Sequence, residues 1–100
     1  MSTQPVVACV GDSITKGQVS ANYVRTLERR WASKDVRFVN AGVNGDLAFN
    51  VAQRLDAVIA QRPDFVTLLI GTNDVNSQFD DTWKARYRKD QKLPVDPSRD

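Results

Sequence analysis

Three short polar motifs contain the residues of this chain that are best suited to chemistry. Ser13 lies in a Gly-Asp-Ser-Ile-Thr motif, Gly45 in an Asn-Gly-Asp motif and Asn73 in a Gly-Thr-Asn-Asp motif. An acyl-transfer site requires a hydroxyl held on a tight turn, and N–H donors aimed at the oxygen that becomes negative in the tetrahedral intermediate. A serine, a glycine that lets backbone approach the substrate and an uncharged amide donor match those requirements.

Each of these residues is also of a type that serves local structure. Ser13 is suited to capping a turn or helix, and Gly45 to a turn that needs a glycine. Asn73 and Asp74 are suited to Asx turns. Asp12 is better suited to bonding the backbone of its own turn than to acid catalysis or metal binding. Taken one at a time, the residues leave both interpretations open, so their placement decides between them.

The chain has no histidine and one cysteine, which limits the catalytic schemes that it can support. Histidine is the commonest general base, so these 100 residues alone cannot supply the usual base of a catalytic mechanism. Cys9 lies in an apolar run, where we expect a small buried thiol rather than a nucleophile or a metal ligand. We expect no metal ion and no cofactor.

Apolar residues follow two patterns along the chain, one typical of buried strands and one of amphipathic helices. Short apolar runs predict strands over residues 6–10, 36–40 and 65–70. Spacings of three and four residues predict one helix that starts at a Ser20 cap and ends near residues 33–35. A second predicted helix starts at an Asp46 cap and stops before Pro63. The run 65–70 is nearly all apolar, as expected for a parallel strand covered on both faces.

The order strand, helix, strand, helix, strand predicts an α/β fold with a three-layer α/β/α, flavodoxin-like parallel sheet. With the strand order 2-1-3 of such sheets, the first strand is central. Ligand sites lie beyond the carboxyl ends of the strands, where Ser13 would stand between the Gly45 loop and the Asn73 loop. Because 100 residues are few for a sheet covered on both faces, we expect the N-terminal portion of a single domain, truncated after about the third strand.

Residues 77–100 are rich in charge and carry three aromatic residues, Phe79, Trp83 and Tyr87. The four-residue spacing of the aromatics predicts a short helix with one aromatic stripe. We expect this segment to be a surface insertion or a lid whose aromatics pack on the body of the domain. Residues 93–100 contain two prolines and are predicted to form a loop.

Composition and charge exclude several classes of partner. The formal net charge is +2, from 14 basic and 12 acidic residues spread along the chain, so nucleic acid and anionic membranes are not expected partners. The sequence has no apolar stretch long enough to span a bilayer or to form the core of a signal peptide, so we expect a cytoplasmic protein.

The three motifs, in this order and each at the end of a predicted strand, resemble the first three sequence blocks of the SGNH/GDSL hydrolases over residues 6–76. The resemblance implies a serine esterase or acyl hydrolase that acts on small-molecule, carbohydrate or lipid esters through an acyl-serine intermediate. It implies that Ser13 is the nucleophile. The implied oxyanion-hole donors are the backbone N–H groups of Ser13 and Gly45 and the side-chain amide of Asn73. Asp12 and Asp74 are the implied supports.

The fourth sequence block of the SGNH/GDSL hydrolases has no match in this chain. That block is an aspartate three residues before a histidine, and the chain has no histidine. The resemblance therefore implies that a longer chain supplies the aspartate and the histidine. The 100 residues alone are expected to be inactive or weakly active.

Two other functions remain open. The segment from Gly11 to Thr15 is placed to cradle a phosphate at a helix N-terminus, which would make the chain a phosphate- or nucleotide-binding module without catalysis. Its glycines are too sparse for a dinucleotide fingerprint or a P-loop, and no Gly-Lys-Ser/Thr follows. The third function is that of an inactive or structural relative. A sheet cut after its third strand would, however, leave the apolar 65–70 edge without a neighbour.

Overall fold

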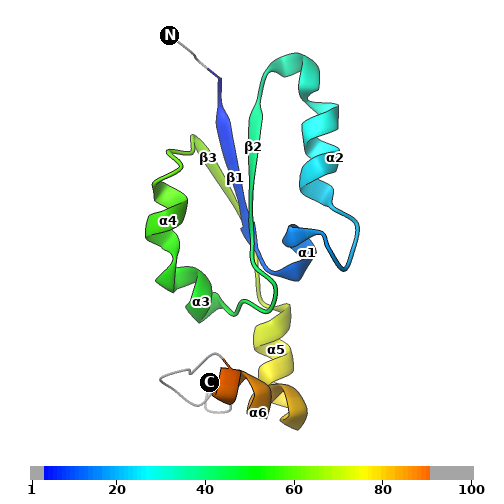
Figure 1. The fold of residues 1–100 in the computed structure, drawn as a ribbon, viewed down its shortest axis with the longest axis vertical. Coiled ribbons are helices and arrows are strands. Elements are labelled where there is room, and N and C mark those ends of the chain that lie inside the picture. Colours follow the sequence, from blue (N-terminus) through cyan, green and yellow to red (C-terminus); the bar gives the residue numbers. More distant parts are fainter. Residues whose placement is uncertain (1–3, 91–100) are drawn as a thin grey trace. The chain divides into compact units, whose positions relative to one another are not determined.

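The computed structural model of the chain describes residues 4–90 (Figure 1). Its elements belong to two units, Met1–Ile70 and Gly71–Asp100. The first unit contains, in chain order, β1 (Val6–Gly11), α1 (Ser13–Lys16), α2 (Tyr23–Arg30), the 3₁₀ helix η1 (Ala32–Lys34), β2 (Arg37–Gly42), α3 (Ala48–Gln53), α4 (Leu55–Ile59) and β3 (Phe65–Leu69). The second unit contains α5 (Thr72–Phe79) and α6 (Asp81–Asp90).

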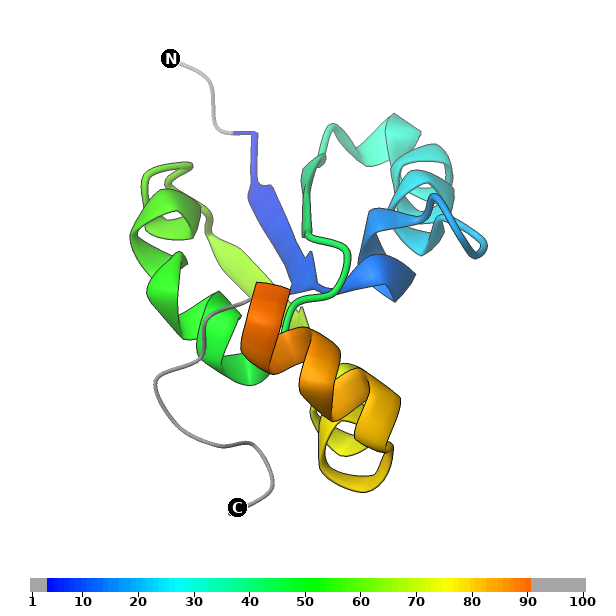
Figure 2. The ribbon, with the colours of Figure 1, turned by 60° about the horizontal axis from the view of Figure 1, so that its bottom comes forward.

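The three strands form one parallel sheet in the order β2-β1-β3. Gly11, at the end of the central strand, lies opposite Gly42 of β2 and Leu69 of β3. The carboxyl ends of the strands therefore lie at one edge, and the loop that follows β2 passes beside the end of β1 (Figure 2). This confirms the predicted α/β class and strand order, and the predicted strands differ from the observed ones by one or two residues at their ends.

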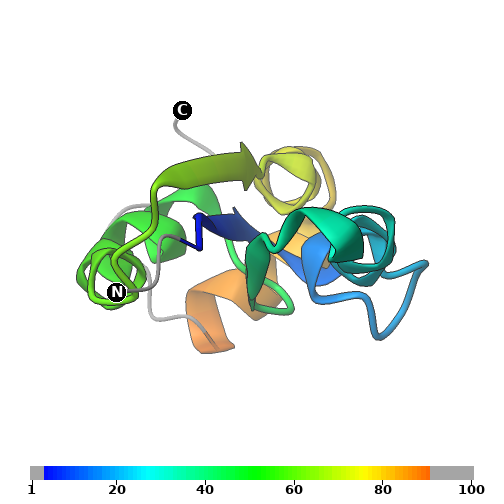
Figure 3. The ribbon, with the colours of Figure 1, turned by 90° about the horizontal axis from the view of Figure 1, so that it is seen from above.

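Helices cover both faces of the sheet, with α3 and α4 on one side and α1 and α2 on the other (Figure 3). Successive residues of a strand point to opposite faces, so Ala8 and Val10 of β1 share one face. They are buried against Val51 of α3 and Val58 of α4. Cys9 points to the opposite face and is fully buried, as the sequence predicts for a structural thiol.

β3 is an edge strand, and all five of its residues are exposed. The sequence predicts a strand covered on both faces, but within the described residues only β1 pairs with β3. An apolar pocket of about 230 Å³ opens beside the strand, lined by Val10, Ala48, Val51, Ala52, Leu55, Val66, Leu68 and Ile70. The uncovered edge is the one that the sequence predicts for a sheet truncated after its third strand.

Two predicted helix caps are wrong. The helix α2 begins at Tyr23 rather than next to Ser20, because the Asn22 side chain accepts a hydrogen bond from the Arg25 N–H at 3.0 Å. Asp46 is not the N-cap of α3, because that position is Leu47, and the Asp46 carboxylate forms an ion pair with Arg54. The three- and four-residue spacing of apolar residues predicted that these helices exist, but it did not predict the residues at which they begin.

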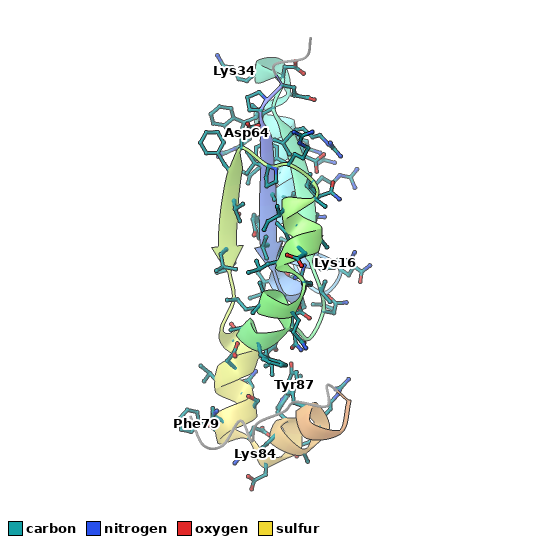
Figure 4. The ribbon with its side chains drawn as sticks, turned by 90° about the vertical axis from the view of Figure 1, so that its left-hand side faces the viewer. Lys16, Lys34, Asp64, Phe79, Lys84 and Tyr87 are labelled. Atoms are coloured by element: carbon teal, nitrogen blue, oxygen red, sulfur yellow. The ribbon has the colours of Figure 1, made fainter. Side chains whose placement is uncertain are left out.

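A pair of hydrogen bonds closes the amino end of the sheet between β1 and β3. Asp64 lies at the amino end, where its carboxylate accepts the Val6 N–H at 2.8 Å. The Val6 carbonyl in turn accepts the Asp64 N–H, also at 2.8 Å. This reciprocal pair fixes the start of β3 against β1, whereas Lys16, the last residue of α1, lies toward the opposite end of the sheet (Figure 4).

The second unit is a pair of helices joined at Asp80. Trp83 and Tyr87 of α6 stack with ring centroids 5.8 Å apart, and the Arg86 guanidinium lies 5.6 Å from the Trp83 ring centroid. This confirms the predicted short helix with an aromatic stripe. Phe79 is not in the stripe, because it ends α5 and is 86% exposed. The loop predicted for residues 93–100 lies outside the described residues.

Candidate active site

The Ser13 turn follows the central strand directly. Asp12 caps α1, because its Oδ1 accepts the Ile14 N–H at 3.0 Å. Asp12 is buried, as suits the backbone-bonding role predicted for it. The capping role considered for Ser13 is therefore filled by its neighbour. Ser13 is the first residue of α1 and partly exposed, and within residues 4–70 its hydroxyl makes no hydrogen bond.

Close packing holds this turn against the sheet. Gly42 of β2 lies so near the turn that a Cβ on it would stand 2.9 Å from the Asp12 carbonyl oxygen. On β1, a Cβ on Gly11 would stand 2.6 Å from the Leu69 carbonyl oxygen. Thr15 of α1 is fully buried, and its hydroxyl lies 2.8 Å from the Tyr23 hydroxyl of α2. The backbone around Ser13 is thus fixed on several sides.

The Gly45 loop is tied to the end of the same strand. The Val43 N–H donates to the Gly11 carbonyl at 3.1 Å, and the Asp46 N–H donates back to the Val43 carbonyl at 3.2 Å. Gly45 sits inside this turn with φ of 82°, a left-handed conformation that favours glycine. Ser13 and Gly45 each lie two residues beyond the Val43–Gly11 bond. The fold therefore brings the two loops to one edge of the sheet, as predicted.

Two polar residues that the sequence did not single out brace these loops. Asn40 donates through Nδ2 to the Thr15 carbonyl at 2.8 Å, and its Oδ1 accepts the Gly42 N–H at 3.0 Å. Arg54 donates through Nε to Asp46 at 2.7 Å and through Nη2 to the Gly11 carbonyl at 3.1 Å. The sequence did carry a signal for Asn40, because asparagine is depleted in strands and this one lies inside a predicted strand. Arg54 offered none beyond its place in a helical pattern.

Asn73 and Asp74 belong to the second unit. They lie in the first turn of α5, which begins at Thr72, so the predicted loop is here a helix start. Gly71 precedes them with φ of 132°, a backbone conformation that favours glycine. Asn73 is buried, and the Asp74 carbonyl accepts the Ser77 hydroxyl at 2.8 Å. The role of the Asn73 amide as a third donor, and that of Asp74 as a support, stay predictions.

Residues 4–90 contain neither a metal-binding cluster nor a helix suited to span a membrane. In that part of the chain no three His, Cys, Asp or Glu side chains gather to hold a metal ion. None of its helices combines the length and apolar character needed to cross a bilayer.

Comparison with known proteins identifies the relatives of this fold. The model of the GDSL-like lipase/acylhydrolase family matches residues 9–90. An acetylxylan esterase from Geobacillus stearothermophilus is 33% identical, over 71% of this chain and 40% of that protein. A solved catalytic mutant of Axe2, an acetylxylan esterase from the same organism, has a TM-score of 0.68 and 28% identity, over 86% of this chain and 47% of that one.

A further solved structure has a different described activity. The lipase/acylhydrolase from Enterococcus faecalis has a TM-score of 0.65 and 29% identity, over 77% of this chain and 43% of that one. The chain thus spans less than half the length of each of these relatives. Since the family match extends over most of the chain and includes both the Ser13 turn and the Gly45 loop, this chain belongs to the GDSL-like lipase/acylhydrolase family.

Proposed function

We propose that this chain supplies the nucleophile and the oxyanion hole of a serine esterase that cleaves carboxylic esters through an acyl-serine intermediate. Ser13 is the nucleophile. The backbone N–H groups of Ser13 and Gly45 donate to the developing oxyanion, together with the side-chain amide of Asn73. The observation that carries the proposal is the 3.1 Å Val43–Gly11 bond, because it ties the Gly45 loop to the strand that ends in the Ser13 turn.

The proposed reaction has two steps. The Ser13 Oγ attacks the ester carbonyl carbon, its proton passes to a general base, and the bond from carbon to the alcohol oxygen breaks as that oxygen takes the proton. Water then cleaves the acyl-Ser13 ester by the same route and releases the acid. In each step the carbonyl oxygen becomes negative, and losing one donor to it typically costs about a hundredfold to a thousandfold in rate.

The general base is proposed to come from polypeptide beyond these 100 residues, because the chain contains no histidine. Catalytic mutants of Axe2 have been solved in which alanine replaces a serine, an aspartate or a histidine. The aspartate and histidine of that protein are three residues apart. Without the base, we expect the isolated chain to be inactive or to retain only the roughly 10³- to 10⁴-fold catalysis over water that an oxyanion hole and binding provide.

The substrate class that we propose is an acetyl ester on a carbohydrate. Support comes from the relatives described as acetylxylan or acetyl-xylooligosaccharide esterases. A lipase/acylhydrolase is among the structural relatives as well. Comparing the rates on acetyl esters and on esters of longer acids therefore tests the proposed preference for acetyl esters. The lid or surface insertion predicted for residues 77–100 stays part of this proposal.

A labelling experiment tests the role of Ser13 in the chain as it stands. The chain is incubated with 4-nitrophenyl acetate and with imidazole as an external base, and its peptides are analysed by mass spectrometry. We expect acetyl groups on Ser13, and nitrophenolate release above that of imidazole alone. Ser13→Ala should return the rate to that of imidazole alone, while the matched change Ser20→Ala, at an exposed serine, should not.

Two results would count against the esterase. One is acetylation spread equally over exposed hydroxyls, which would mean that Ser13 has no special reactivity. The other is saturable binding of phosphate or a nucleotide with no acetylation, which would favour the phosphate-binding alternative. Against that alternative, α1 spans only four residues, which is little helix to build up a dipole at its N-terminus.

A further inference from the structure

Arg54 links the Gly45 loop to the strand that carries the Ser13 turn. It lies where the predicted single helix breaks into α3 and α4, with φ of −112° and ψ of 15°. From this position its side chain reaches back to the sheet. Its Nε donates to the Asp46 carboxylate at 2.7 Å and its Nη2 to the Gly11 carbonyl at 3.1 Å.

The linked groups flank the proposed oxyanion donor and the nucleophile. Asp46 follows Gly45 directly, so a bond to its carboxylate limits how far the preceding peptide can move. Gly11 lies two residues before Ser13, and its carbonyl also accepts the Val43 N–H. One guanidinium therefore connects the residue after Gly45 to Gly11, two residues before Ser13. A planar fork with several N–H donors can hold two such acceptors at once, which a compact ammonium does less well.

The bridge is shielded from solvent. The Asp46 side chain is 7% exposed and the Arg54 side chain 24%. Charge-assisted bonds in such a setting are shorter and stronger than neutral ones, and they hold geometry well. A surface ion pair would not do this, because screening and side-chain freedom leave it little net strength.

We propose that Arg54 is a positioning residue, which sets the distance between the Gly45 N–H and the Ser13 hydroxyl through its bonds to Asp46 and Gly11. This rests on the proposed esterase function. The positioning role adds a requirement to that function, because preorganised donors stabilise an oxyanion only when they already point at the oxyanion. Arg54 touches neither nucleophile nor donor, so its effect passes through the backbone.

The test compares three variants with a control. Arg54→Met removes both bonds and keeps an unbranched apolar side chain at the position. The double variant Asp46→Asn with Arg54→Met leaves no unpaired buried charge, so it stays informative if the single variant fails to fold. Arg54→Lys keeps the charge opposite Asp46 but lacks the fork. Arg29→Met, at an exposed position of α2, is the matched control.

The readout is single-turnover acetylation of Ser13 at increasing ester concentration, with imidazole as the base. In the double variant we expect the maximal rate to fall by about tenfold to a hundredfold, as for a misplaced catalytic group, with an unchanged half-saturation concentration. Arg54→Lys should recover the melting temperature more fully than the rate. The control should match the unmodified chain in both. A structural role alone would move the melting temperature and leave the rate of the folded protein unchanged.

A second readout does not depend on catalysis. The ¹H–¹⁵N resonance of the Gly45 amide should shift, and its hydrogen exchange should speed up, in the folded double variant but not in Arg29→Met. A folded double variant that is acetylated at the normal rate, with an unmoved Gly45 resonance, overturns the proposal. If the unmodified chain is not acetylated at all, the esterase function fails, and the Gly45 resonance alone decides whether Arg54 holds the loop.

Discussion

Replacing Gly42 by alanine should loosen the candidate site, and the structure indicates by how much. A Cβ at this position would stand 2.9 Å from both the Asp12 carbonyl oxygen and the Lys16 Cα, and nearer still to the Lys16 backbone nitrogen. All three neighbours are main-chain atoms, so no side-chain rotation relieves the contact. The turn that carries Ser13 has to move away from β2, which also changes its relation to the Gly45 loop.

Adding a methyl group to a close-packed interior typically costs about 1–3 kcal/mol. In a domain of this size each kcal/mol lowers the melting temperature by about 4–8 °C. We therefore expect Gly42→Ala to melt at least about 4 °C below the unmodified chain. Because a shift of about 1 Å in a catalytic group can cost about a hundredfold, acetylation of Ser13 should slow by a larger factor than the stability loss alone explains.

Circular dichroism melting and the imidazole-assisted acetylation assay measure the two effects. Ser20→Ala is the control for melting, because Ser20 is exposed and caps no helix. Surface changes of this kind usually alter stability by less than about 0.5 kcal/mol. A Gly42→Ala variant that melts with the control and acetylates normally would refute the packing of the Ser13 turn on β2.

Two further predictions follow from the fold. Asn22→Ala should destabilise the chain by about 0.5–2 kcal/mol in urea unfolding, because Asn22 caps α2. Ser20→Ala should not destabilise it, and equal effects of the two changes would contradict the Asn22 cap. An open edge strand with apolar side chains favours pairing with a second copy, so we expect the chain to self-associate, and Leu68→Thr should reduce this in sedimentation velocity because Leu68 is 61% exposed on β3. Its stability should change by less than about 0.5 kcal/mol, and unchanged self-association would mean that this edge does not drive it.

The sequence predicted most of the fold because the signals for it are local. Each strand is an apolar run that ends at a glycine or a polar turn, and the segments that form α2, α3 and α4 show helical apolar spacing. The helices α1 and α5, which start in the polar motifs, were not predicted. Parallel strands joined through helices then leave few possible topologies. The order β2-β1-β3, and with it the meeting of the Ser13 turn and the Gly45 loop, followed from these elements.

The contacts that fix the site could not be predicted because they join residues far apart in the chain. The Arg54 bond to the Gly11 carbonyl spans 43 positions, and the Asn40 bond to the Thr15 carbonyl spans 25. Asp46 illustrates the consequence. Its place before a helix favoured a cap, but Leu47 is the N-cap of α3 and the Asp46 carboxylate pairs with Arg54, eight residues later. Helix propensity and spacing carry no information about such partners.

Glycine is required at Gly45 and at Gly11 for two different physical reasons, one a backbone conformation and the other close packing. Gly45 has a positive φ, so its backbone conformation requires glycine. Gly11, the first residue of the Gly-Asp-Ser motif, does not have a positive φ. Glycine is required at this position because Thr15 and the Leu69 carbonyl occupy the space where a Cβ would stand. The glycine before Asp12 and Ser13 therefore brings α1 back over the end of β1, and the same close approach leaves the Gly11 carbonyl in reach of both Val43 and Arg54.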